Sequence, residues 1–117
     1  MQDFRHLKVW EKSHKLTLSI YKISLAFPRE EVYGLTSQLR RSCMSIPTNI
    51  AEGCCRGTDA EFKQFIQISM GSASETEYQL LLARDLGYIN EEVHNQLTNE
   101  ITEIKQMLAS LIKKLKA

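Results

Sequence analysis

The sequence predicts an all-α protein that forms a single antiparallel, up-down four-helix bundle over residues 1–117. Apolar residues recur every three or four positions in four segments, and no segment shows the two-residue alternation of a half-buried strand. Turn residues separate the segments, and helices of about 20 to 29 residues joined by short turns favour antiparallel neighbours. The expected helices span residues 4–26, 35–54, 58–86 and 90–116.

Two adjacent apolar stripes run along the first expected helix. A monomeric bundle needs an apolar stripe about 100° wide, so the second stripe predicts contact with another copy of the chain. The Phe27-Pro28 pair ends the helix, because proline lacks an N–H and disfavours helical geometry in the residue before it. Residues 27–34 should then form a loop closed by Gly34. The stripes comprise Leu7, Trp10, Leu18, Tyr21 and Leu25, and Val9, Leu16, Ile20, Ile23 and Phe27.

The second expected helix contains a proline in its interior. Pro47 cannot donate a hydrogen bond to the carbonyl of Cys43, so we expect a kink and a side chain or water that meets the freed carbonyl. Gly53 and Gly57 mark the turn that follows. The core face of this helix consists of Leu39, Cys43, Ile46 and Ile50.

Capping residues begin the last two expected helices. Thr58 and Glu61 form a capping box, and Asn90 is a good N-cap residue followed by two acids in the first turn. Gly87 ends the third helix. The inner stripe of the third helix includes small residues that allow close approach, and the fourth shows a heptad seam. These stripes are Phe62, Phe65, Ile66, Ser69, Ala73, Leu80 and Ala83, and Leu97, Ile101, Ile104, Leu108, Leu111 and Leu115.

Composition and charge restrict where the protein works. No apolar run approaches the roughly 20 residues that cross a bilayer, and the first residues lack the apolar stretch of a secretory signal. We therefore expect a cytoplasmic protein with no membrane partner. The net charge is only +1, yet residues 1–57 carry +4 and residues 58–104 carry −7. Such asymmetry indicates either a nucleic-acid face or a complementary contact between subunits.

The residues that could support catalysis are too far apart to do so. Two Glu-x-x-His pairs with two further glutamates match the inventory of a di-iron bundle, but a rise of about 1.5 Å per residue spreads them over about 30 Å. Cys43 and Cys54 share a helix without a histidine, so packing is the better interpretation. We expect no catalytic residue, no metal and no cofactor. The candidate ligands are Glu11, His14, Glu52, Glu75, Glu91 and His94.

Two polar lines remain as candidate functional residues. The line on the second helix is either solvated or a partly buried network, in which its charged and amide groups satisfy one another or a neighbouring subunit. The line on the first helix is basic, and it is either a solvated face or a surface that binds the phosphate backbone of RNA or DNA. The lines consist of Gln38, Arg41, Ser45, Asn49, Glu52 and Arg56, and of Arg5, Lys8, Lys12, Lys15 and Lys22.

The run from Phe27 to Gly57 resembles the signature of the bacterial four-helix-bundle proteins named for intervening sequences in large-subunit ribosomal RNA genes. The shared residues are Phe27-Pro28, Tyr33-Gly34-Leu35-Thr36, Gln38-Leu39-Arg40-Arg41, Ser45-Ile46-Pro47 and Asn49-Ile50-Ala51-Glu52-Gly53, flanked by Trp10, Tyr21, Phe62, Phe65, Gly71-Ser72 and Glu75. The resemblance implies a ring-like homopentamer with no established enzymatic activity. It also implies a distant relationship to the accessory protein of diversity-generating retroelements, which works with reverse transcriptase and nucleic acid through a basic surface.

These observations favour a non-enzymatic homo-oligomer, pentameric by resemblance, that binds nucleic acid or a ribonucleoprotein through the basic line of the first helix. The alternative is an oligomeric scaffold that binds a protein partner and no nucleic acid. A bundle with a ligand or metal site is a third hypothesis, which the spacing of the candidate ligands disfavours.

Overall fold

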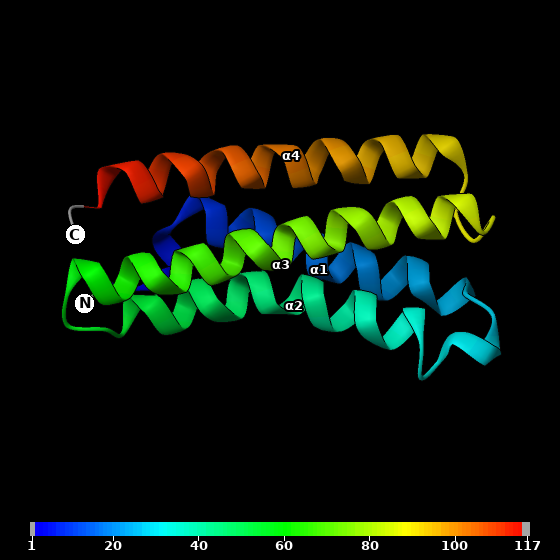
Figure 1. The fold of residues 1–117 in the computed structure, drawn as a ribbon, viewed down its shortest axis with the longest axis horizontal. Coiled ribbons are helices and arrows are strands. Elements are labelled where there is room, and N and C mark those ends of the chain that lie inside the picture. The colour runs from blue at the N-terminus through cyan, green and yellow to red at the C-terminus, as the bar shows by residue number, and fades with distance from the viewer. Residues whose placement is uncertain (1, 116–117) are drawn as a thin grey trace.

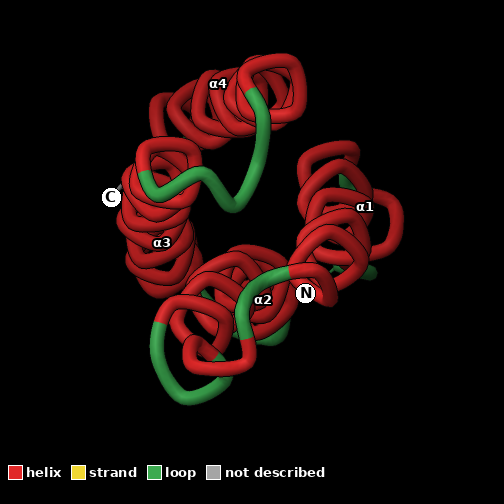
Figure 2. Tube along the Cα trace, turned by 90° about the vertical axis from the view of Figure 1, so that its right-hand side faces the viewer, coloured by secondary structure: helices red, strands yellow, loops and turns green. Residues whose placement is uncertain are grey.

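The computed structural model describes residues 2–115 and contains four α-helices: α1 (Lys8–Ile23), α2 (Leu35–Cys54), α3 (Asp59–Asp85) and α4 (Glu91–Lys114). Consecutive helices run in opposite directions, so both chain ends lie at the same end of the bundle (Figure 1). Viewed along the helices, α1 and α3 lie diagonally opposite each other, with α2 and α4 between them (Figure 2). The described residues contain no strand, which confirms the predicted all-α class.

The first helix is shorter than predicted, because a short 3₁₀ helix lies at each end of it. The Asp3 side chain accepts a hydrogen bond from the Arg5 N–H at 3.0 Å and so caps a separate turn, η1 (Phe4–His6). Leu7 then adopts extended geometry, with φ −86° and ψ 124°, and α1 begins after it. At the other end the chain tightens into η2 (Ser24–Ala26), because the Phe27-Pro28 pair requires an extended backbone.

Pro47 lies inside α2, which continues through it. The Thr17 hydroxyl of α1 donates to the Cys43 carbonyl at 3.4 Å, so a side chain meets the acceptor that the proline leaves without its helical donor. A side chain beside the freed carbonyl agrees with that part of the sequence prediction, and the kink stays a prediction. The same hydroxyl also donates to the Ser13 carbonyl one turn earlier in α1 at 2.7 Å, so its single hydrogen is shared and the Ser13 bond is the shorter one. A polar contact between α1 and α2 therefore lies beside the proline.

Small and hydroxyl residues join α2 to α3. Ser42 bonds to Thr76 at 2.9 Å and donates to the Gln79 side-chain oxygen at 2.6 Å, and all three side chains are buried. At the far end of the pair, a Cβ added to Gly53 would lie 2.7 Å from Phe62 Cδ1. Because Gly53 has no side chain, the backbone of α2 can approach Phe62 of α3 this closely.

The loop between α1 and α2 is tied to the turn between α3 and α4. One Glu31 carboxylate oxygen accepts from the Leu35 N–H at 3.0 Å, and the other accepts from the Tyr88 hydroxyl at 2.8 Å. These donors, the Leu35 amide first, lower the pKa of Glu31. Glu31 belongs to a short 3₁₀ helix, η3 (Arg29–Glu31), within the predicted loop. The carboxylate therefore holds this end of the bundle together.

The core follows the predicted stripes with few differences. Buried residues include Leu16, Ile20, Leu39, Ile46, Ile50, Ile66, Leu80, Ile101, Ile104 and Leu108. Phe65 is only half-buried. The Arg56 guanidinium carbon lies 4.6 Å from the centroid of its ring. Among residues 2–115, no helix combines the length and apolar character that spanning a bilayer requires.

Candidate functional site

An apolar groove of about 580 Å³ runs between α1 and α2 on the outside of the bundle. Its α1 side contains part of the predicted stripe that runs from Leu7 to Leu25, which the bundle core leaves partly uncovered. Leu18 is 58% exposed and Tyr21 is 40% exposed, and Leu25, one turn farther on, is 78% exposed. The groove is lined by Phe4, Trp10, His14, Thr17, Leu18 and Tyr21 on one side and by Met44, Pro47, Thr48 and Ala51 on the other.

Aromatic contacts hold the groove in shape. Trp10 stacks on His14 with ring centroids 5.0 Å apart, and Phe4 meets the Trp10 edge at 4.8 Å. Phe4 reaches this position because η1 is separate from α1. At the other end the Arg40 guanidinium lies 4.7 Å from the Tyr21 ring centroid, and its Nε donates to Ser24 Oγ at 2.8 Å. The groove therefore has a fixed cation at its rim.

The structure does not place the five predicted basic residues on one helical face, although all five are exposed. Arg5 lies in η1, outside α1, and pairs with Asp3 at 3.1 Å. Lys12 pairs with Glu103 of α4, and Lys15 lies 3.9 Å from Glu11. Within residues 2–115, no carboxylate pairs with Lys8 or Lys22. The expectation that all five lie on one helix is therefore wrong for Arg5, because the extended Leu7 separates η1 from α1, which holds the four lysines.

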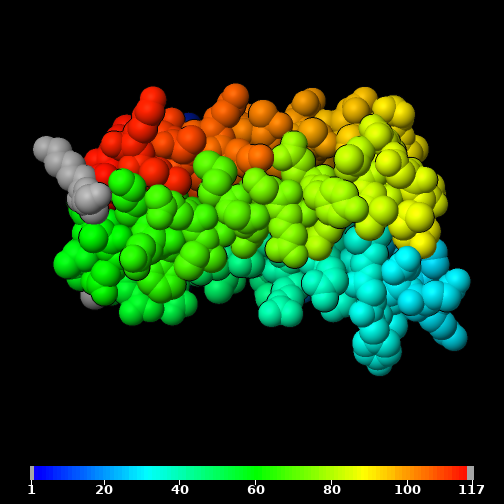
Figure 3. All heavy atoms as spheres, in the orientation of Figure 1, coloured from blue at the N-terminus to red at the C-terminus, as the bar shows by residue number. Residues whose placement is uncertain are grey.

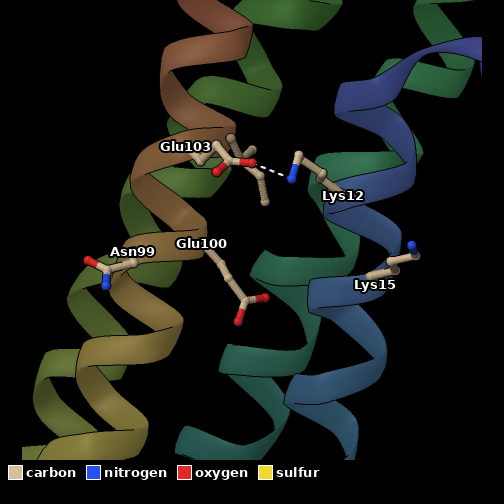
Figure 4. Close-up of a pocket in the computed structure, with 6 residues that line it drawn as sticks. Lys12, Lys15, Asn99, Glu100 and Glu103 are labelled. Atoms are coloured by element: carbon tan, nitrogen blue, oxygen red, sulfur yellow. Dashed lines mark ion pairs between the residues drawn. The ribbon is translucent and has the colours of Figure 1, made fainter.

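A second pocket, of about 290 Å³, lies where α1 meets α4 (Figure 4). Lys12 points across it toward Glu103, and Glu100 points into the space between the helices, whereas the ends of Lys15 and Asn99, which also line the pocket, point outward. Burial raises the pKa of Glu100, and the contact with Glu103 raises the pKa of Lys12. Carboxylates therefore stand beside the basic residues of α1 and weaken their attraction for phosphate. The sequence hides this pairing, because the partners are about ninety positions apart.

The predicted polar line of α2 divides into separate groups within the chain. Asn49 Nδ2 donates to both the carbonyl and the hydroxyl of Ser45 at 2.9 Å, and Ser72 of α3 donates to that hydroxyl at 2.8 Å. Arg56 pairs with the exposed Glu52 at 3.2 Å. Gln38 and Arg41 are exposed. The six side chains therefore do not form one network inside a single copy.

The predicted catalytic and metal candidates are spread through the bundle. No three His, Cys, Asp or Glu residues among residues 2–115 are grouped so as to hold a metal ion. Burial raises the pKa of the Cys43 thiol to about 12, so Cys43 is a packed thiol and a poor nucleophile. His94 is 8% exposed, and its Nε2 lies 3.3 Å from the Thr98 hydroxyl.

Comparisons with known proteins agree on one family. The family model described as 23S rRNA-intervening sequence protein matches residues 5–110. A crystal structure of a protein of unknown function from the S23 ribosomal protein family of Bacteroides thetaiotaomicron VPI-5482 is 32% identical, with a TM-score of 0.81. The similarity covers 91% of this chain and 99% of that chain. No curated protein matches the sequence.

Proposed function

The chain belongs to the family of 23S rRNA-intervening sequence proteins, and from that premise we propose that it is a non-enzymatic bundle that assembles with copies of itself through the α1–α2 groove. The exposed part of the α1 stripe that runs from Leu7 to Leu25 carries this proposal. Leu18 and Leu25 are more than half exposed, and Leu18 lies in a groove with aromatic residues on the outside of the bundle. Contiguous apolar surface of this kind marks an interaction site more often than a solvated face.

A second copy of the chain suits this groove because the charges of the two halves of the molecule are opposite. Residues 1–57, which include both groove helices, carry +4, and residues 58–104 carry −7. Complementary faces on identical copies allow an assembly without another partner. The resemblance described above favours a ring of five.

Light scattering tests the assembly. The parent should have a mass of about five times the 13.5 kDa of one chain if the ring is a pentamer. Leu18→Glu should lower that mass, because a charge would have to be buried in the groove. Asn95→Glu on the exposed surface of α4 adds the same charge and should assemble as the parent does. A parent mass of 13.5 kDa would refute self-association.

Nucleic-acid binding is a second candidate function. It is favoured by the exposure of all five basic residues and by the lack of an ion-pair partner for Lys8 and Lys22 within residues 2–115. Because carboxylates neutralise part of this surface, each copy should bind weakly. An assembly would repeat the contact and raise the apparent affinity by multivalency.

Retention of labelled RNA and DNA across a salt series tests this second function. Binding should be sequence-tolerant, should weaken steeply with salt as counterions are released, and should be lost in the triple variant Lys8→Glu, Lys12→Glu, Lys15→Glu. If the parent retains neither nucleic acid at about 50 mM salt, or if the triple variant binds equally well, the assembly is better described as a protein-binding scaffold.

A further inference from the structure

The outer face of α3 has a composition that its place in a single chain does not explain. Eleven consecutive residues, 64–74, carry no charge, although they lie in the middle of a helix with a long solvent-facing side. Ile68 is 51% exposed and Tyr78 is 61% exposed. In Figure 3 α3 crosses the middle of the molecule in green and yellow-green, open to solvent along its length. A solvated helix normally carries charged side chains on this side.

Gly71 lies in the centre of this face, exposed, in the interior of a 27-residue helix. A Cβ added there would meet nothing within 4 Å, whereas a Cβ on Gly53 would meet Phe62 at 2.7 Å. Glycine destabilises a helix interior relative to alanine, and nothing in the packing of the chain itself requires it here. A glycine at this position is explained if another backbone or bulky side chain approaches α3 closely from outside.

The helices that carry the two faces have opposite net charges. α1 and α2 contain six Lys/Arg and two Glu, whereas α3 contains five Asp/Glu and two Lys/Arg. Arg41 precedes Met44 and Thr48 by three and seven positions, so it extends the α2 side of the groove. Glu75 lies between Gly71 and Tyr78 on α3. Arg41 and Glu75 are both exposed, and neither forms an ion pair within residues 2–115.

The two faces also lie on different sides of the molecule. α1 and α3 are diagonal partners in the bundle, with α2 between them (Figure 2), and no residue of α3 lines the groove. One neighbour cannot cover both faces of a copy. Two neighbours can, if each contact joins the groove of one copy to the α3 face of the next.

We propose that the outer face of α3, defined by Ile68, Gly71, Glu75 and Tyr78, docks into the α1–α2 groove of a second copy of this chain. The proposal rests on the proposed function, in which the groove is a subunit contact. It adds that the contact is head-to-tail and joins two different surfaces. A head-to-tail contact generates a closed ring when the rotation between copies closes, and an open filament when it does not.

Mixing two variants tests the pairing of unlike faces. Leu18→Glu places a charge in the groove and leaves the α3 face unchanged. Ile68→Glu places a charge on the α3 face and leaves the groove unchanged. Each variant alone should have the mass of one 13.5 kDa chain, and the mixture should form a one-to-one pair of twice that mass. A groove-to-groove contact predicts instead that Ile68→Glu assembles as the parent does, and that result would overturn the proposal.

Gly71→Leu gives an independent variant that keeps the fold, because nothing lies within 4 Å of the new Cβ. It should retain the helical circular dichroism of the parent and lose assembly. If the parent assembles and both Ile68→Glu and Gly71→Leu do too, the head-to-tail contact is wrong while self-association stands. If the parent is a monomer, self-association fails and the α3 contact fails with it.

Discussion

Replacing Thr17 by valine removes the hydroxyl that donates to the Cys43 carbonyl. Pro47 has no N–H, so it leaves this carbonyl without its helical donor. Valine keeps the shape of the side chain, and Thr17 is only 8% exposed, so water should not replace the donor. An unmet buried acceptor costs about 1–3 kcal/mol, and the long 3.4 Å contact argues for the lower end. A loss of about 1 kcal/mol lowers the melting temperature by roughly 3–6 °C for a chain of this size.

Urea denaturation at one protein concentration measures the loss, and a double-mutant cycle identifies its cause. In Pro47→Ala the new N–H can donate to the Cys43 carbonyl, so Thr17→Val should then cost less than about 0.5 kcal/mol. Thr48→Val is the matched control, because the exposed Thr48 hydroxyl bonds to the Met44 carbonyl at 2.8 Å in a regular turn. If Thr17→Val lowers the free energy of unfolding by the same amount in the parent and in Pro47→Ala, the missing N–H of Pro47 is not the cause of the loss.

Two further predictions concern the ends of the bundle. Gly53→Ala should destabilise the protein by roughly 1–3 kcal/mol because its Cβ would overlap Phe62, whereas Gly57→Ala, with nothing within 4 Å, should change little in the same urea titration. The pKa of Glu31 is lowered by the Leu35 amide and then by the Tyr88 hydroxyl, so its contribution to stability is present above the ordinary value of 4.5 and is lost as pH falls below it. Tyr88→Phe should therefore melt with a shallower decline between pH 6 and 3 than the parent does, and an unchanged decline would contradict the role of that hydroxyl.

The helices were predictable from sequence where local signals act alone. Thr58 accepts from the Glu61 N–H at 3.2 Å, and Asn90 accepts from the Val93 N–H at 2.8 Å, as the capping signals predict. The predicted start of the first helix, at residue 4, is wrong because Asp3 caps a separate turn. The apolar period is continuous in the sequence, but the extended Leu7 divides the residues that carry it between η1 and α1. Periodicity reports which residues share a face, but it does not report a cap that begins a separate turn.

The surface was less predictable than the core. The sequence shows two apolar stripes on the first helix, more than one core needs, and the structure leaves Leu18 and Leu25 of one stripe exposed. The pairing of Lys12 with Glu103 joins residues distant in sequence, and only the fold brings them together. The sequence holds one signal for the outer face of α3, namely the absence of charge from residue 64 to residue 74, which apolar periodicity does not detect.

The fluorescence of Trp10 tests most directly whether copies assemble through the α1–α2 groove. Trp10 is the only tryptophan of the chain and lines that groove, so its emission reports whether the groove is covered. On dilution its emission should shift to longer wavelength and its quenching by acrylamide should rise, in step with the fall in mass measured by light scattering. Leu18→Glu should show the diluted values at every concentration. A mass that falls while Trp10 stays unchanged would place the contact elsewhere on the molecule and contradict the account.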